Sequence, residues 1–344
     1  MMRAPFSFAV VVRRRDGSLL VRERAMGVGP GGIARWPFVR GIASLVESLR
    51  LGGEALRFSA DQWEKDMLAA SRAAGTALLS ALGLSLFAMA TRDDGAPAEP
   101  EGGSRSRAAT WVMLVVAIGF FVALPQAAAA GMSRALHLGL PVQSAAFQAV
   151  TGAFKLTIVV GYLLAIRRVP DIRRVFQYHG AEHKTISTYE AGEALTVANA
   201  RAKTMLHARC GTTFLVMVAL VSILVFTAIG AALPRIQTGS AFLDNVAFFI
   251  EKLPFLPVLV AATFELQRLF ARYCSTGPLQ ALLWPGFLVQ KITTAQPTDD
   301  QLEVALASLR VTLFREQGAS GAEASTVDVA FPSYEALLAA PSLR

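Results

Sequence analysis

Five stretches of this chain are apolar over nearly the length that a helix needs to cross a lipid bilayer. They cover roughly residues 68–91, 108–131, 142–166, 212–233 and 247–270. A membrane-spanning helix needs about 20 predominantly apolar residues. Of the 344 residues, 53% are hydrophobic and only 17% are charged, which is unusual for a soluble domain. The sequence therefore predicts a mainly α, polytopic membrane protein whose principal partner is the lipid bilayer.

The distribution of basic residues predicts how these stretches cross the membrane. Residues 1–67 hold eleven lysines and arginines and residues 167–211 hold eight, whereas 132–141 offers only Arg134. Basic segments stay preferentially on the cytoplasmic side. We therefore expect a bacterial inner-membrane protein with both termini and 167–211 in the cytoplasm. This topology requires an even number of crossings before residue 167.

One of the first three apolar stretches must then fail to cross. The stretch 68–91 is the weakest, because it contains Arg72 together with several glycines and serines. We predict a re-entrant or surface position for it and firm spans in the other four stretches. The linker 92–107 that follows has the composition of a disordered segment.

The remaining segments predict smaller elements. Asp16-Gly17 between two apolar runs is a strong β-hairpin signal, and no cleavable signal peptide is expected before it. Apolar residues at helical spacing predict amphipathic helices near residues 36–58 and 299–315. The expected regions are a cytoplasmic hairpin region (1–35), a surface helix (36–66), an ambiguous apolar segment with linker (67–107), two spans (108–166), a cytoplasmic His-rich helical hairpin (167–211), two spans (212–270), a cytoplasmic amphipathic region (271–316) and a flexible tail (317–344).

Charge and cysteine content exclude two further classes of protein. The net charge is +8, but the basic residues gather in the polar segments and do not interleave with aromatic residues, so no nucleic-acid partner is expected. Cys210 and Cys274 are the only cysteines and cannot form a disulfide framework. In a reducing compartment both thiols are free for other chemistry.

Three of the four histidines fall in the segment 167–211, which is the most chemistry-like part of the chain. His179 and His183 are four residues apart on an expected helix, so both rings lie on one face and can reach one ion. With Glu182 they fit the H-x-x-E-H pattern, in which two histidines bind zinc and the glutamate transfers protons. Five residues with two free positions also match by chance, so this pattern needs support from the rest of the segment.

His207 and Cys210 supply that support. Their His-x-x-Cys spacing brings together an imidazole and a thiolate, and both suit zinc or iron. The return of the chain through a short helical hairpin would place them opposite the first two histidines. Four bound ligands would make a closed structural site, whereas three would leave a position for water. Glu182 would then be the general base, and Glu190 a spare ligand or the partner that orients a histidine.

Other interpretations stay open for the same residues. The histidines fit a polar packing role, with hydrogen bonds to Glu182, Glu190 and the backbone, and Cys210 fits a small buried residue. Lys184 and Arg209 fit either the positive-inside rule or the binding of an anionic substrate. A separate pair, Lys155 and Glu265, consists of ionisable residues inside expected spans, which pair with one another or line a cavity.

The sequence resembles the YqhQ-like family of multi-spanning bacterial membrane proteins, which carry the general label of predicted metal-dependent enzymes. The resemblance rests on MMRAP at the start and on PFVRGIASLVESLRLG (37–52), FQYHGAEHKTISTYEAGEALTV (176–197), LHARCGTTFL (206–215) and DDQLEVALASL (299–309). It implies membrane residence and a metal site that includes the two histidine motifs, and it implies no particular substrate.

Two functions follow as hypotheses. The first is a metal-dependent hydrolase, with zinc bound by His179, His183 and His207 and optionally Cys210, and with Glu182 as the proton-transfer residue. The second is a non-enzymatic membrane scaffold or assembly factor with a closed structural site. Transport, a third possibility, would depend on Lys155 and Glu265.

Overall fold

The computed structural model describes residues 1–26, 36–74, 123–230, 239–274, 277–318 and 326–340, with Val112, Val116 and Phe120. Three helical stretches in these parts of the chain are long and apolar enough to cross a membrane. They are α5 (Ala145–Ile166), α8 (Gly211–Gly230) and the continuous stretch Leu243–Tyr273, which comprises most of α9 (Ala241–Lys252), η3 (Leu253–Phe255) and α10 (Leu256–Tyr273). Three of the four predicted spans therefore coincide with helices of membrane length.

The remaining apolar stretches are only partly described. Of 108–131, the structure gives α4 (Leu124–Ala135) at its end, while 75–107 lies outside the described residues. The helix α1 (Val39–Ala74) includes the predicted surface helix and extends to the beginning of 68–91. The number of crossings before residue 167, and with it the predicted topology, is therefore not tested by the structure.

The apolar helices α5 and α8 pack closely at a glycine. α5 begins after Ser144, whose hydroxyl accepts a hydrogen bond from the Phe147 amide at 3.1 Å and so caps the helix. Further along α5, a Cβ on Gly152 would lie 2.3 Å from Cγ1 of Ile223. α5 and α8 therefore approach one another through the space that a side chain would fill.

A buried lysine joins three of these helices. Lys252 of α9 is 6% exposed and donates a hydrogen bond from Nζ to Oε1 of Gln148 in α5 at 3.0 Å. Its ammonium lies 4.1 Å from the ring centroid of Phe248 and 5.3 Å from that of Phe226 in α8. Such cation–π contacts strengthen when the charge is desolvated. Lys252 is not among the predicted site residues, although a lysine inside an apolar stretch is itself a functional signal.

The predicted N-terminal hairpin is confirmed as part of a four-stranded antiparallel sheet. Its strands β1 (Met2–Arg3), β2 (Ser7–Arg13), β3 (Leu19–Ala25) and β4 (Thr326–Phe331) follow the order β1-β2-β3-β4. Gly17 has a φ of 87° in the turn between β2 and β3, a conformation that favours glycine. Ser18 donates its amide to the Asp16 carboxylate at 2.9 Å, which fixes the turn.

The fourth strand corrects the expectation of a flexible tail from residue 317. Residues 326–331 pair with β3 in the register Val21↔Val329, and Arg22 of β3 bonds the Asp328 carboxylate at 2.7 and 2.8 Å. The helix α13 (Tyr334–Ala339) follows and buries Leu337 completely. The Gly, Ala and Ser content around these residues indicated a flexible segment. It gave no sign of a short strand, because the pairing partner of β4 lies about 300 residues earlier in the sequence.

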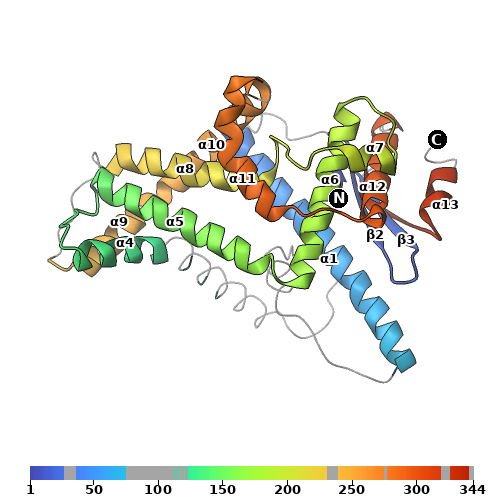
Figure 1. Ribbon diagram of the computed structural model, residues 1–344, viewed down its shortest axis with the longest axis horizontal. Coiled ribbons are helices and arrows are strands. Elements are labelled where there is room, and N and C mark those ends of the chain that lie inside the picture. The colour runs from blue at the N-terminus through green and yellow to red at the C-terminus, as the bar shows by residue number, and fades with distance from the viewer. Residues whose placement is uncertain are drawn as a thin grey trace.

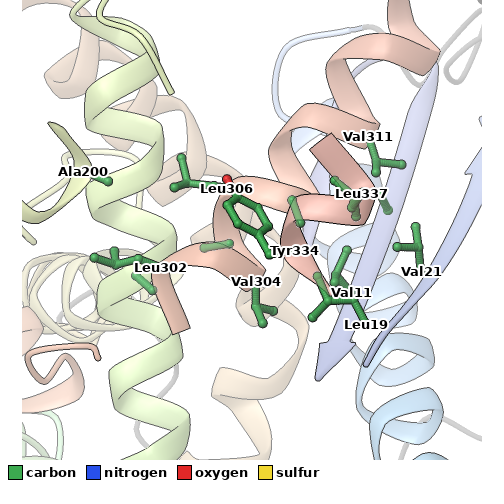
Figure 2. Packing of buried hydrophobic residues seen from close by; sticks show 14 residues of the cluster. Val11, Leu19, Val21, Ala200, Leu302, Val304, Leu306, Val311, Tyr334 and Leu337 are labelled. Carbon is green, nitrogen blue, oxygen red and sulfur yellow. The ribbon is translucent and has the colours of Figure 1, made fainter. Parts of the chain in front are cut away.

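The core outside the apolar helices lies around α12 (Asp299–Gly318), between the sheet and α6 (Pro170–Glu190), as Figure 2 shows. Leu302 and Leu306 are buried here, which confirms the helix predicted near 299–315. α12 packs against both β2 and α6. The sheet therefore supports α6, the helix with two of the candidate metal ligands (Figure 1).

Replacement of Leu337 by alanine is expected to loosen β4 and α13. Removal of a fully buried leucine side chain costs about 2–5 kcal/mol, and Leu337 is 0% exposed. Amide hydrogen exchange of β4 measures this loss. The neighbouring Leu338→Ala is the matched control, since Leu338 is 36% exposed. Equal exchange of β4 in the two variants would show that α13 does not hold the strand.

Candidate metal centre

Two turns of one helix and the start of a second helix bring together three of the four predicted metal ligands. His179 and His183 lie on successive turns of α6, and Cys210 directly precedes α8. One donor atom from each residue lies within 4.8 Å of the other two. Nε2 of His179 is 3.2 Å from Sγ of Cys210, and the ring centroids of the two histidines are 4.4 Å apart. We call these three residues the His–His–Cys cluster.

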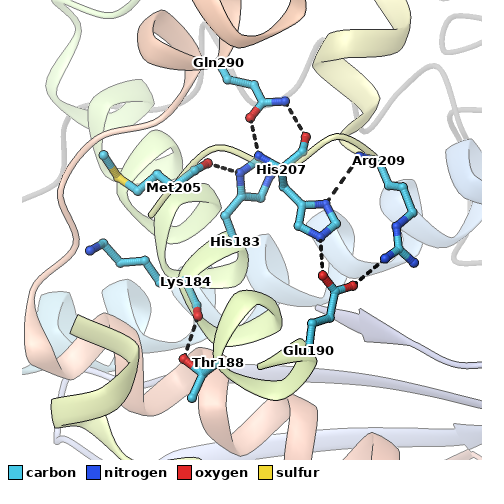
Figure 3. Close-up of polar contacts among 8 residues, drawn as sticks. All are labelled: His183, Lys184, Thr188, Glu190, Met205, His207, Arg209 and Gln290. Atoms are coloured by element: carbon cyan, nitrogen blue, oxygen red, sulfur yellow. Dashed lines mark hydrogen bonds and ion pairs between the residues drawn. The ribbon is translucent and has the colours of Figure 1, made fainter. Parts of the chain in front are cut away.

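A backbone carbonyl orients each histidine of this cluster. Nδ1 of His179 is 2.9 Å from the carbonyl oxygen of Thr293, at the end of α11 (Trp284–Thr293), and Nδ1 of His183 bonds the carbonyl of Met205 (Figure 3). A carbonyl oxygen only accepts, so Nδ1 carries the hydrogen in both rings. The lone pair of a neutral ring is then on Nε2. Metal-binding histidines are oriented in the same way.

Cys210 and His179 shift one another's pKa in opposite directions. Burial raises the pKa of the Cys210 thiol, but hydrogen bonds and charge from His179 and His183 outweigh it and lower the pKa to about 5. Burial lowers the pKa of His179, but Cys210, the Thr293 carbonyl and Glu182 raise it to about 9. The cluster therefore already supports a thiolate, which is the form of cysteine that binds metals.

His207 lies beside this cluster but is held by a different partner. Its ring centroid is 5.8 Å from that of His183, and its Nε2 is 3.3 Å from Oε2 of Glu190. Arg209 bonds the other Glu190 oxygen at 2.6 Å (Figure 3). Burial lowers the pKa of His207, with Glu190 acting in the opposite direction. The structure thus places His207 next to the His–His–Cys cluster, paired with a carboxylate.

The segment that holds His207 is fixed by a glutamine that the sequence analysis missed. Gln290 of α11 accepts from the His207 amide at 2.8 Å and donates to its carbonyl at 2.6 Å. Gln290 also donates to the Thr213 hydroxyl at the beginning of α8 at 2.5 Å. One amide side chain therefore connects α11, the His207 segment and α8.

A cavity of about 320 Å³ opens beside the cluster. The residues that line it are His179, Glu182, His183, Ile186, Glu190, His207, Arg209, Cys210 and Gly211. Two carboxylates, a histidine and an arginine therefore share one space with the three converging donors. Glu182 accepts a hydrogen bond there from the amino group of Met1 at 2.5 Å.

The two basic residues expected near the site have different environments. Arg209 lines the cavity and its side chain is 66% exposed. Lys184 is buried and is absent from the cavity lining; its Nζ donates to the carbonyls of Arg201 and Lys203, both at 2.7 Å. Lys184 therefore holds the end of α7 (Val197–Ala202).

Lys155 and Glu265, the two ionisable residues of the expected spans, do not bond one another. Glu265 of α10 bonds the Arg40 guanidinium of α1, at 2.6 Å for Nε, and accepts from the Phe38 amide at 3.3 Å. Lys155 lies on α5, seven residues beyond Gln148 and thus near the same helix face. Glu265 serves here to join α1 to α10.

From the lowered pKa of Cys210 we predict how the alkylation of this thiol depends on pH when no metal is bound. Thiolate, the reactive form, persists as pH falls until about 5 and is then lost. In His179→Gln the pKa is expected to rise toward the ordinary value of 9.0, so alkylation at pH 7 falls by on the order of tenfold or more. Mass spectrometry of iodoacetamide labelling measures both effects, with the buried Cys274 as internal reference. Equal labelling of the two proteins would exclude the His179 contact as the cause.

Fold and cluster together define a class: a mainly α protein whose described residues include three candidate membrane-spanning helices and a buried His–His–Cys cluster that could hold a metal ion. The chain belongs to the DUF1385 family, described as "Protein of unknown function (DUF1385)", which matches residues 36–315. It is similar to "Uncharacterized protein YqhQ" of Bacillus subtilis (strain 168), with 28% identity over 316 residues. That match covers 90% of this chain and 89% of its relative. No solved structure matches the chain.

Proposed function

We propose that the His–His–Cys cluster binds zinc and that the protein is a metal-dependent hydrolase of the bacterial inner membrane. The observation that carries the proposal is the orientation of both histidines. Each Nδ1 is held by a backbone carbonyl, so each Nε2 faces the cysteine thiolate. Nitrogen and thiolate donors of this kind suit zinc. When bound, zinc supplies Lewis acidity that activates water or polarises a carbonyl or phosphoryl group.

The side chains that line the cavity supply the remaining functions of a hydrolase. Glu182 is the proposed proton-transfer residue, as the H-x-x-E-H pattern indicates. Glu190 orients the His207 ring through the contact at 3.3 Å and also bonds Arg209, so these three side chains form one polar wall of the same cavity. Arg209 offers an exposed guanidinium that binds an anionic substrate group.

Topology completes the proposal. The cluster lies between α5 and α8, in the segment with eight basic residues, and we assign it to the cytoplasmic face with both termini. Alkaline phosphatase fusions test the assignment. A fusion after residue 140, at the opposite end of α5, should be active, and a fusion after residue 195 should be inactive. The reverse result would place the cluster outside the cytoplasm.

A second candidate function is a scaffold with a closed structural site. It is favoured by the position of His207, whose ring lies 5.8 Å from that of His183 and so close enough to become a fourth ligand after a small movement. Such a site has no position for water or substrate. Glu190, which bonds His207, would then regulate closure. In the described parts of the chain, no contact of Glu265 or Lys155 favours transport over these two functions.

Cobalt substitution distinguishes the two candidates without knowledge of the substrate. Cobalt(II) in the cluster should show absorption from the Cys210 thiolate, and added azide should change its visible spectrum if a coordination position is open. His207→Ala should leave the response to azide unchanged under the hydrolase proposal. An azide response that appears only in His207→Ala would instead establish a closed site and the scaffold function. Glu182→Gln should retain cobalt in either case.

A further inference from the structure

A second cavity, of about 480 Å³, lies at the other end of α5. It is formed by the end of α4, the loop 136–144, the start of α5 and part of α9, which gather at one end of the molecule (Figure 1). α5 has 22 residues and therefore separates this cavity from α6 by about 33 Å. The two cavities thus face opposite sides of the membrane that α5 is expected to cross.

The polar part of this cavity is made of groups that bind anions. Arg134, His137 and Asn245 line it, and none of its described lining residues is a carboxylate. Ser133 accepts the Leu140 amide at 3.0 Å through its hydroxyl oxygen, which leaves the hydroxyl hydrogen available as a donor. No carboxylate in the described parts of the chain forms an ion pair with Arg134 or His137. An arginine without an acidic partner, beside a hydroxyl, suits a phosphate group, which guanidinium binds through two parallel hydrogen bonds.

The apolar part of the cavity indicates a ligand larger than phosphate. Leu140, Val142 and Phe147 form its other wall. Cavities of about 300–1,000 Å³ typically hold small organic ligands, well above the size of a single phosphate ion. Leu136 and Leu138 on the adjoining loop are 60% and 49% exposed, at the end of an apolar helix bundle where a membrane interface is expected.

We propose that this cavity binds the phosphate of an anionic phospholipid headgroup on the membrane face opposite the His–His–Cys cluster. Arg134 and His137 contact the phosphate, Ser133 donates to it, and the apolar wall accepts the glycerol and the first acyl carbons. The site depends on none of the residues of the proposed metal centre. Its test can therefore fail or succeed independently of the proposed function.

Thermal unfolding of the purified, detergent-solubilised protein tests the proposal. The probes are short-chain phosphatidylglycerol, short-chain phosphatidylcholine and inorganic phosphate, each titrated separately. The test variant is Arg134→Gln with His137→Asn. Asparagine is chosen because residue 137 has a φ of 52°, a left-handed conformation that asparagine tolerates. Arg168→Gln, at the opposite end of α5, is the matched control, and Arg134→Lys tests whether the guanidinium itself is needed.

Phosphatidylglycerol should raise the unfolding midpoint of the wild type and of Arg168→Gln with the same apparent affinity. The double variant should bind it at least about tenfold more weakly, since two charge-assisted contacts are lost. Arg134→Lys should lie between the two. If inorganic phosphate binds with the same affinity as phosphatidylglycerol, the ligand is soluble phosphate and the assignment to a lipid headgroup is wrong. Equal binding of phosphatidylglycerol by the wild type and the double variant, or equal binding of phosphatidylcholine, would overturn the anion site. If the double variant is unfolded before lipid is added, Arg134→Lys takes its place. Weaker binding of phosphatidylglycerol than in the wild type then supports the anion site, and equal binding overturns it.

Discussion

Replacement of His183 by alanine is expected to reduce the zinc content of the purified protein from about one equivalent to background. Two donors would remain in a cluster where three lie within 4.8 Å of one another. Loss of a hydrogen-bond partner of a ligand already costs about 10–100-fold in metal affinity, and loss of the ligand itself costs more. Elemental mass spectrometry of protein purified under reducing conditions measures the result.

Cysteine variants provide the matched comparison for this experiment. Cys210→Ala should lose zinc as His183→Ala does, whereas Cys274→Ala should retain it, although both thiols are buried and free. His207→Ala should also retain zinc under the hydrolase proposal, because Glu190 holds that ring. Wild-type protein that remains without metal after reconstitution with zinc would contradict the proposed site. The histidines would then serve for polar packing alone.

Local sequence patterns were sufficient to predict the elements whose structure depends on nearby residues. Asp16-Gly17 predicted the hairpin, and the leucines of 299–315 predicted α12, because turn chemistry and helical spacing operate over a few residues. β4 was missed because its stability comes from pairing with β3, about 300 residues earlier. Similarly, the leucine spacing of 299–315 did not show that α12 packs between the sheet and α6. Periodicity shows that a face is apolar but not what covers it.

In the candidate site, too, features set by nearby residues were predicted and features set by distant residues were not. The i, i+4 spacing correctly placed His179 and His183 on one helix face, and the His-x-x-Cys motif brought Cys210 to them. The sequence could not show that His207 bonds Glu190, since that contact depends on how the segment before α8 returns. It also could not show the carbonyls of Thr293 and Met205, because a backbone acceptor leaves no trace in residue identity. Lys184 was placed near the site by sequence proximity, yet its ammonium bonds the end of α7.

Gly180, between the two histidines of α6, is expected to be essential for the geometry of the cluster. A Cβ at this position would lie 2.4 Å from the carbonyl oxygen of Ala295 and 3.0 Å from Sδ of Met205. The amide of Ala295 bonds the carbonyl of Phe176 in α6, so the segment after α11 lies directly against this helix. Gly180→Ala must displace both Ala295 and Met205. The Thr293 carbonyl, two residues before Ala295, and the Met205 carbonyl orient the histidines and are expected to move with them.

Gly180→Ala should therefore weaken zinc binding by about 10–100-fold, the usual cost of losing the partners that orient a ligand. It should also destabilise the fold by about 1–3 kcal/mol through overpacking. Competition with a chromogenic chelator measures the first effect and susceptibility to proteolysis the second. Gly161→Ala in α5 is the matched control, because nothing lies within 4 Å of its added Cβ, and alanine should stabilise that helix by up to about 1 kcal/mol. Wild-type zinc affinity in Gly180→Ala would show that the histidines keep their orientation without the carbonyl contacts, and would remove the main support for a preorganised metal site.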